Sequence, residues 1–127
     1  MEKRKVSSTN FENEQILQDE CPFIFALSIM GKRWKPAILW KLSQGINRFG
    51  KLKREIPPIS EKMLTQHLRE LERDQLVTRT VYAEVPPRVE YELTALGKTL
   101  EPILAQLNDW GTRTMGDFRQ TETPGGQ

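Results

Sequence analysis

The spacing of the apolar residues changes near Gln75 from the period of a helix to the period of a strand. Between residues 64 and 71, leucines recur at i, i+4 and i+7, which places them on one side of a helix. The segments 77–82 and 89–93 instead alternate apolar and polar residues and are rich in β-branched ones, as half-buried strands are. The sequence therefore predicts a helix followed directly by a β-hairpin.

The helix that precedes the hairpin has a well-marked start. Ser60 is a good N-cap residue, and Ile59 before it can pack on Leu64. Two prolines lie just before the cap and end a shorter helix near residues 48–55. Two helices joined by a tight turn that contains prolines form the pattern of a helix-turn-helix.

Further helices flank this unit. The segments 22–30 and 34–44 have helical spacing, and each is followed by a glycine. Thr94 is predicted to cap a long final helix, with Pro102 inside it as a kink. The predicted fold class is therefore mainly α with a small β-hairpin, a winged helix-turn-helix with additional N- and C-terminal helices.

The chain is predicted to be one folded unit with polar ends. Residues 1–15 are expected to be a flexible N-terminal segment, and residues 119–127 a disordered tail. Residues 16–118 are assigned to a single domain, because they contain no internal repeat and no low-complexity linker.

The net charge of +2 hides an uneven distribution along the chain. Residues 31–73 carry eleven lysines and arginines against four acidic residues, while the segments on either side are net acidic. A basic patch of this kind is the footprint expected of a protein that binds nucleic-acid phosphates, although a solvated helix face has the same composition.

Several other classes of protein are disfavoured. No segment has the roughly 20 apolar residues that span a bilayer, and the N-terminus lacks the apolar core of a signal peptide, so a cytoplasmic location is expected. A single cysteine forms no internal disulfide and no zinc site, and no metal or other cofactor is expected. There is no G-x-S-x-G elbow, no glycine-rich phosphate loop and no second histidine, so an enzyme is not predicted.

The polar face of the helix that begins at Ser60 is the candidate DNA-reading surface. An α-helix fits the major groove, where glutamine can pair with adenine and arginine with guanine. A solvated face of an ordinary surface helix is the alternative, and the hairpin that follows favours DNA binding. The predicted recognition residues are Ser60, Lys62, Thr65, Gln66 and Arg69.

Basic residues on either side of this helix are predicted to contact the DNA backbone. Such contacts set affinity and register without carrying sequence information. Arg88 at the hairpin tip would reach the minor groove or its phosphates, with a plain turn arginine as the alternative, and Pro86 and Pro87 would stiffen this wing. The predicted phosphate contacts are Arg48, Lys51, Lys53 and Arg54, with Lys32, Arg33 and Lys35 as further candidates.

Cys21 and His67 are the residues with redox or titration chemistry. Cys21 is predicted at a helix N-terminus, which favours the thiolate, while the adjacent Asp19 and Glu20 disfavour it. As a redox sensor it would need an intersubunit disulfide or a small-thiol adduct; otherwise it is a small residue packed at an interface. His67 lies beside the leucine stripe, where partial burial or a phosphate contact is expected rather than catalysis.

A series of short motifs spans roughly residues 20–118. They are Cys21-Pro22, Gly31-Lys32-Trp34, Arg48-Phe49, Ile59-Ser60-Lys62-Met63-Leu64-Thr65, Leu68-Arg69-Leu71, Glu84-Val85-Pro86-Pro87-Arg88-Val89-Tyr91 and Leu93-Thr94-Leu96-Gly97. In this order and spacing, they resemble the motifs of the HxlR-type transcriptional regulators, which are similar to the MarR group.

The resemblance implies a homodimeric regulator, bacterial or archaeal, that binds a palindromic operator in double-stranded DNA as a repressor or an activator. It also implies a dimer interface between the terminal helices, for which Phe23, Leu104, Leu107 and Trp110 are candidates. Several members of the family sense oxidants or electrophiles through a cysteine near the first helix, so an oxidant or a small molecule is a candidate effector. The alternative function is a winged helix that serves protein–protein contact, RNA binding or non-specific nucleic-acid binding.

Overall fold

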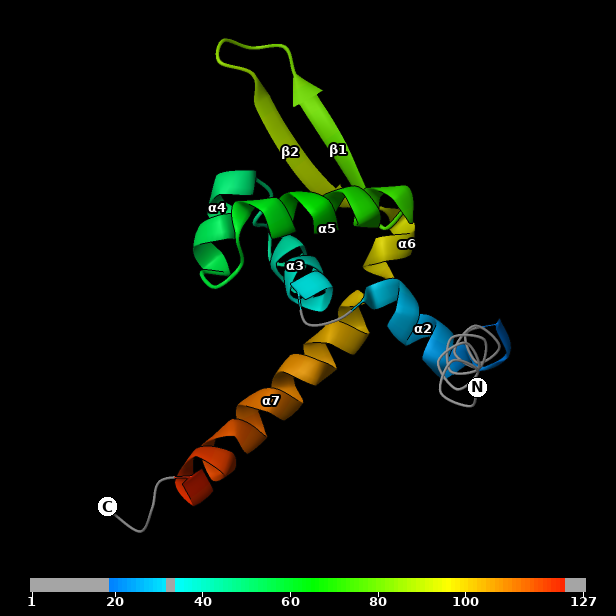
Figure 1. Cartoon of the computed structure of the whole chain (residues 1–127), viewed down its shortest axis with the longest axis vertical. Helices are drawn as coiled ribbons and strands as arrows, with labels where there is room; N and C mark the ends of the chain where they lie inside the picture. Colours follow the sequence, from blue (N-terminus) through cyan, green and yellow to red (C-terminus); the bar gives the residue numbers. More distant parts are fainter. Residues whose placement is uncertain (1–18, 32–33, 123–127) are drawn as a thin grey trace, which may run out of the picture.

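The computed structural model describes residues 19–31 and 34–122, which form a series of helices and one two-stranded sheet (Figure 1). The elements in chain order are α2 (Pro22–Met30), α3 (Trp34–Ser43), α4 (Phe49–Glu55), α5 (Glu61–Arg73), β1 (Val77–Tyr82), β2 (Arg88–Leu93), α6 (Ala95–Lys98) and α7 (Glu101–Glu122). This order confirms the predicted winged helix-turn-helix, with α4 and α5 as the motif and the hairpin as the wing. The predicted flexible segment 1–15 lies outside the described residues.

Helix α5 begins where the sequence predicts it. The Ser60 hydroxyl accepts a hydrogen bond from the backbone N–H of Met63 at 3.1 Å, which satisfies one of the free N–H groups of the first turn. Ile59 and Leu64 are both buried, in agreement with the predicted contact across the cap. Leu68 and Leu71 continue the buried stripe, so one face of α5 belongs to the core and the opposite face is open.

A tight turn connects α5 directly to the hairpin. Gln75 adopts a left-handed conformation with φ of 65°, and the N–H of Leu76 donates to the carbonyl of Leu71 at 2.9 Å. This bond closes the end of the helix. It also brings Val77, the first residue of β1, into the core, so the hairpin is anchored to the same core as α5.

The hairpin has two distinct faces, because alternate residues of a strand point to opposite sides. The face that begins in the core carries Val77, Arg79 and Val81 of β1 and Val89, Tyr91 and Leu93 of β2. The other face carries Thr78, Thr80 and Tyr82 of β1 and Arg88, Glu90 and Glu92 of β2. The N–H of Tyr91 donates to the carbonyl of Asn47 at 2.8 Å, which ties β2 to the segment before α4.

The C-terminal helical region differs from the prediction of one long helix capped by Thr94. Thr94 does act as an N-cap, but of the short helix α6, which ends at Lys98. The chain turns before α7 begins, so Pro102 lies in the first turn of α7, where its missing N–H has no helical partner to lose, and not inside a kinked helix. Helix α7 then continues to Glu122, into the segment 119–127 that was predicted to be a disordered tail.

Helices α2 and α7 project from the body of the domain on the side away from the hairpin (Figure 1). Only the start of α7 packs into the core, through Leu104, which is 3% exposed. Leu104 was predicted as a dimer-interface residue; the structure places it in the core of its own chain, because it packs beneath α3 rather than along the free part of α7.

Candidate nucleic-acid interface

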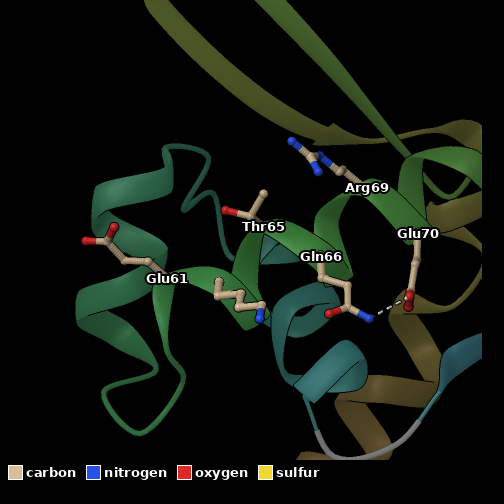
Figure 2. Close-up of a pocket in the computed structure, with 6 residues that line it drawn as sticks. Glu61, Thr65, Gln66, Arg69 and Glu70 are labelled. Carbon is tan, nitrogen blue, oxygen red and sulfur yellow. Dashed lines mark hydrogen bonds between the residues drawn. The ribbon is translucent and has the colours of Figure 1, made fainter.

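The exposed face of α5 carries its polar side chains in two rows. Figure 2 shows Thr65 and Arg69 on the edge of the helix nearer to the hairpin, and Gln66 and Glu70 on the other edge. A shallow open groove runs over this face and is lined by Glu61, Lys62, Thr65, Gln66, Arg69 and Glu70. The structure therefore brings together the predicted recognition residues Lys62, Thr65, Gln66 and Arg69, while Ser60 serves as the cap before them.

An ion pair beneath this groove fixes the position of Glu70. The Nζ atom of Lys35, on α3, lies 2.6 Å from Oε1 of Glu70, and the side chain of Lys35 is only 11% exposed. The amide of Gln66 donates to Oε2 of the same carboxylate at 3.3 Å (Figure 2). These contacts lower the pKa of Glu70 to about 2. The hydrogen bond from Lys35 has the largest effect, and the one from Gln66 has the next largest.

The role expected for Lys35 is thus different in the structure. It was a further candidate for phosphate contact, but its ammonium group is buried against Glu70 and joins α3 to α5. A side chain at Gly31 would collide with it, because an added Cβ would lie 2.5 Å from Cδ of Lys35. The neighbouring candidates Lys32 and Arg33 lie outside the described residues.

The Glu70–Lys35 pair makes a prediction for stability. Since the pKa of Glu70 is lowered from 4.5 to about 2 on folding, the pair stabilises the fold above pH 4.5 and is lost as the pH falls toward 2. We expect Glu70→Gln to lower the free energy of unfolding by about 2 kcal/mol at pH 7. In urea denaturation, this difference from the wild type should remain at pH 5 and shrink by pH 3.

Glu72→Gln is the matched control, because Glu72 is exposed on the same helix and has no ion pair among the described residues. It should leave the stability nearly unchanged at all three pH values. A constant difference between Glu70→Gln and the wild type from pH 7 to pH 3 would contradict a role for the ionised carboxylate.

His67 lies next to this ion pair. Its side chain is 22% exposed, so it is partly buried as predicted, and its Nδ1 lies 3.7 Å from Oε1 of Glu70. This nitrogen is buried and has no hydrogen-bond partner among the described residues. His67 thus faces the inner side of α5 rather than the open groove.

A basic cluster surrounds the start of α4. Arg48, Lys51 and Arg54 line a shallow pocket, whose other lining residues are Gly45, Ile46, Asn47 and Gly50. These side chains recur at i, i+3 and i+6, so they share one side of the helix. Lys53 does not line this pocket and is half-buried elsewhere, so three of the four predicted phosphate contacts form one surface.

Arg88 is engaged within the hairpin. It is the first residue of β2, and its guanidinium donates to the carboxylates of Glu84 and Glu90 and lies 3.8 Å from the centre of the Tyr82 ring. The pKa of Arg88 is raised above its ordinary value, mainly by the hydrogen bond with Glu84 and to a smaller extent by the one with Glu90. The hydrogen bond between Arg88 and Glu84 also lowers the pKa of Glu84. Any contact of Arg88 with DNA competes with these two carboxylates. Pro86 and Pro87 lie in the exposed tip.

Cys21 lies far from this surface in the sequence, at the start of α2. It is the N-cap residue of that helix, its side chain makes no capping hydrogen bond, and it is half-buried. A shallow and mainly apolar pocket surrounds it, lined by Asp19, Glu20, Cys21, Pro22 and Phe25. The predicted position at a helix N-terminus is therefore present.

The remaining predicted interface residues are exposed. Phe23 on α2 is 70% exposed, and Leu107 and Trp110 on α7 are 57% and 53% exposed. Across residues 19–31 and 34–122, no helix is long and apolar enough to cross a membrane, and no three His, Cys, Asp or Glu side chains gather as metal ligands.

Comparison with known proteins finds relatives that match most of the chain. A family model described as HxlR-like helix-turn-helix matches residues 29–118. YdeP of Bacillus subtilis (strain 168), named an uncharacterized HTH-type transcriptional regulator, is 44% identical over 107 residues, which are 84% of this chain and 78% of that protein.

Solved structures agree with this match. The redox regulator HypR in its oxidized form has 46% sequence identity and a TM-score of 0.70, covering 73% of this chain and 96% of that one. The transcriptional regulator YodB from B. subtilis, in its reduced form, has 39% identity and a TM-score of 0.62, covering 72% of this chain and 90% of its own.

Proposed function

The chain belongs to the HxlR-like helix-turn-helix family of transcriptional regulators, and on that premise we propose that it binds a palindromic operator as a homodimer, with α5 in the major groove. The observation that carries this proposal is the open polar face of α5 beside the basic cluster of α4. The first would read base edges, and the second would hold phosphates. The proposed activity is binding, without catalysis, and takes place in the cytoplasm where the chromosome lies.

The alternative is a winged helix that contacts another protein or binds nucleic acid without sequence preference. The cluster of Arg48, Lys51 and Arg54 favours nucleic acid over a protein partner. Among the described residues Lys51 and Arg54 form no ion pair, and Arg48 has only Glu90, at 3.7 Å, so most of the positive charge is available. Sequence preference is then the property that separates a specific regulator from a general nucleic-acid binder.

The experiment compares two substitutions on two kinds of DNA. Gln66→Ala is expected to reduce the preference for the operator over random DNA by about tenfold, because a glutamine paired with a base contributes roughly 1–3 kcal/mol of discrimination. Lys51→Ala should weaken binding to both DNAs by similar factors, because it removes a phosphate contact. Gel-shift titrations with the intergenic DNA beside its gene and with a random duplex measure both effects. Equal losses on both DNAs for both variants would remove the reading role from α5.

We also propose that Cys21 makes the regulator responsive to oxidants. The support is its position at the N-terminus of α2 and the likeness to HypR, which is described as a redox regulator. Oxidation would join two Cys21 thiols of two protomers, or one thiol and a small thiol, with the oxidant taking up the two electrons. Intact-mass analysis and non-reducing electrophoresis after peroxide treatment should show one of these products, and Cys21→Ser should show neither. An unchanged wild-type mass would leave Cys21 as a packing residue.

A further inference from the structure

We propose that the cleft between α5 and the hairpin binds a phosphate of the DNA backbone, and that Arg79 is the residue of the wing that holds it. This inference rests on the proposed function and adds Arg79, which belongs neither to the recognition residues nor to the tip of the wing.

The cleft has the chemistry of an anion site. Its volume is about 340 Å³, and it is lined by Thr65, Arg69, Glu72, Arg79 and Tyr91. The lining contains two arginines and one glutamate, so it is net positive, and Thr65 and Tyr91 complete it with neutral side chains. Guanidinium groups match the geometry of phosphate oxygens and bind them with paired hydrogen bonds.

The fold directs both arginines into this cleft. Arg79 pairs with Tyr91 across the hairpin, on the face that begins in the core with Val77 and Leu93. This face turns toward α5, whose end is joined to β1 by a tight turn. From the helix, Arg69 points toward the hairpin (Figure 2). The two side chains therefore reach the same space from two elements.

Of the two arginines in the hairpin, Arg79 is the one with an uncommitted charge. Within the described part of the chain it forms no ion pair, and it is exposed. Arg88 lies on the opposite face of the hairpin, where Glu84 and Glu90 neutralise it. A phosphate would displace existing partners of Arg88 but none of Arg79, so binding at Arg79 costs less.

The position of the cleft favours a backbone phosphate over a free anion. A helix in the major groove lies between two phosphate chains, so basic groups on both of its sides contact DNA. The α4 cluster lies on the chain segment that precedes α5. The cleft lies beside α5, between Thr65 and Glu72. Together they would hold the DNA backbone at two places along α5, and Gln66 would read bases between them by exchanging its hydrogen bond with Glu70 for one to a base.

The test measures binding to a random-sequence duplex at several salt concentrations. Each neutralised phosphate contributes about 0.9 to the slope of log K against log salt, so Arg79→Ala should make the slope of the dimer shallower by about 2. The affinity of the dimer at low salt should fall by on the order of 10²-fold or more, because the substitution removes a charged hydrogen-bond donor from both protomers. Arg79→Lys should keep most of the slope. Arg113→Ala, which removes an exposed arginine of α7, should change neither quantity.

The possible failures are distinguishable. If Arg79→Ala leaves the slope unchanged while Lys51→Ala lowers it, the cleft is not a phosphate site and the proposed function stands. If Arg79→Ala weakens only operator binding, Arg79 contacts a base and the phosphate assignment is wrong. If inorganic phosphate competes more strongly than chloride at equal ionic strength, the site takes a free anion. If the wild type shows no salt-dependent DNA binding, the proposed function fails and this inference falls with it.

Discussion

Gly97→Ala is expected to lower the free energy of unfolding by about 3 kcal/mol, a large fraction of the roughly 5–15 kcal/mol that holds a domain together. Gly97 is buried in α6, and an added Cβ would lie 2.3 Å from the backbone carbonyl oxygen of Leu76. That oxygen cannot move aside freely, because it accepts a hydrogen bond from the N–H of Thr94 at 3.0 Å. Urea denaturation at a fixed protein concentration measures the loss.

The close approach of Gly97 to the Leu76 backbone is fixed by several further contacts, so a small shift of the chain cannot remove the clash. The Thr94 hydroxyl donates to the carbonyl of Gln75 at 2.7 Å and accepts from the N–H of Gly97 at 3.0 Å. The added methyl would also meet Cδ2 of Leu93 at 3.3 Å. Relief would require α6 to move off the start of β1, which would break the cap and uncover core leucines.

Gly111→Ala provides the matched control. This glycine lies inside α7, and an added Cβ would meet nothing within 4 Å in the chain. Alanine favours a helix over glycine by about 1 kcal/mol, so the substitution should leave the chain as stable or slightly more stable. Similar losses for both glycines would show that the contact with Leu76 does not decide the outcome.

The local part of the fold could be predicted from the sequence because its signals are local. The Ser60 cap, the leucine stripe of α5 and the alternation in the strands each depend on residues within one or two turns, and the structure contains all of them. The break between α6 and α7 escaped prediction for a different reason. Thr94 signals the start of a helix, but the crossing that makes Gly97 necessary depends on Leu76, which is distant in the sequence.

The partners of charged side chains were the main limit at the candidate interface. A lysine count alone cannot show that Lys35 is buried against Glu70, or that Arg88 is shared between Glu84 and Glu90. For Arg79 a signal was present. It lies between Val77 and Val81 in an alternating strand, which places it on the face that packs toward the core. A position inside a strand determines which way the side chain of Arg79 points, whereas a position at the hairpin tip, as predicted for Arg88, does not.

Leu107→Glu combined with Trp110→Glu is expected to convert a dimer into monomers and to weaken operator binding by a factor on the order of 10² or more. Ile103, Leu107 and Trp110 are each more than half exposed and recur at i, i+4 and i+7 on α7. A helix that projects from its domain with such an apolar row is stable only when another surface covers it. The proposed dimer supplies that surface, and charges there would remain buried and unpaired.

The expected loss of DNA binding follows from the symmetry of the proposed operator. A dimer binds its second half-site as an intramolecular event, which typically raises the overall affinity by 10²–10⁴ over a single site. Light scattering coupled to size exclusion reports the mass, and gel shifts with whole and half operators report the affinity. Asn108→Glu adds a charge on a neighbouring exposed position of α7 and should leave both unchanged. If the double variant stays dimeric, the partner chain lies elsewhere, and α7 needs a different cover for its apolar row.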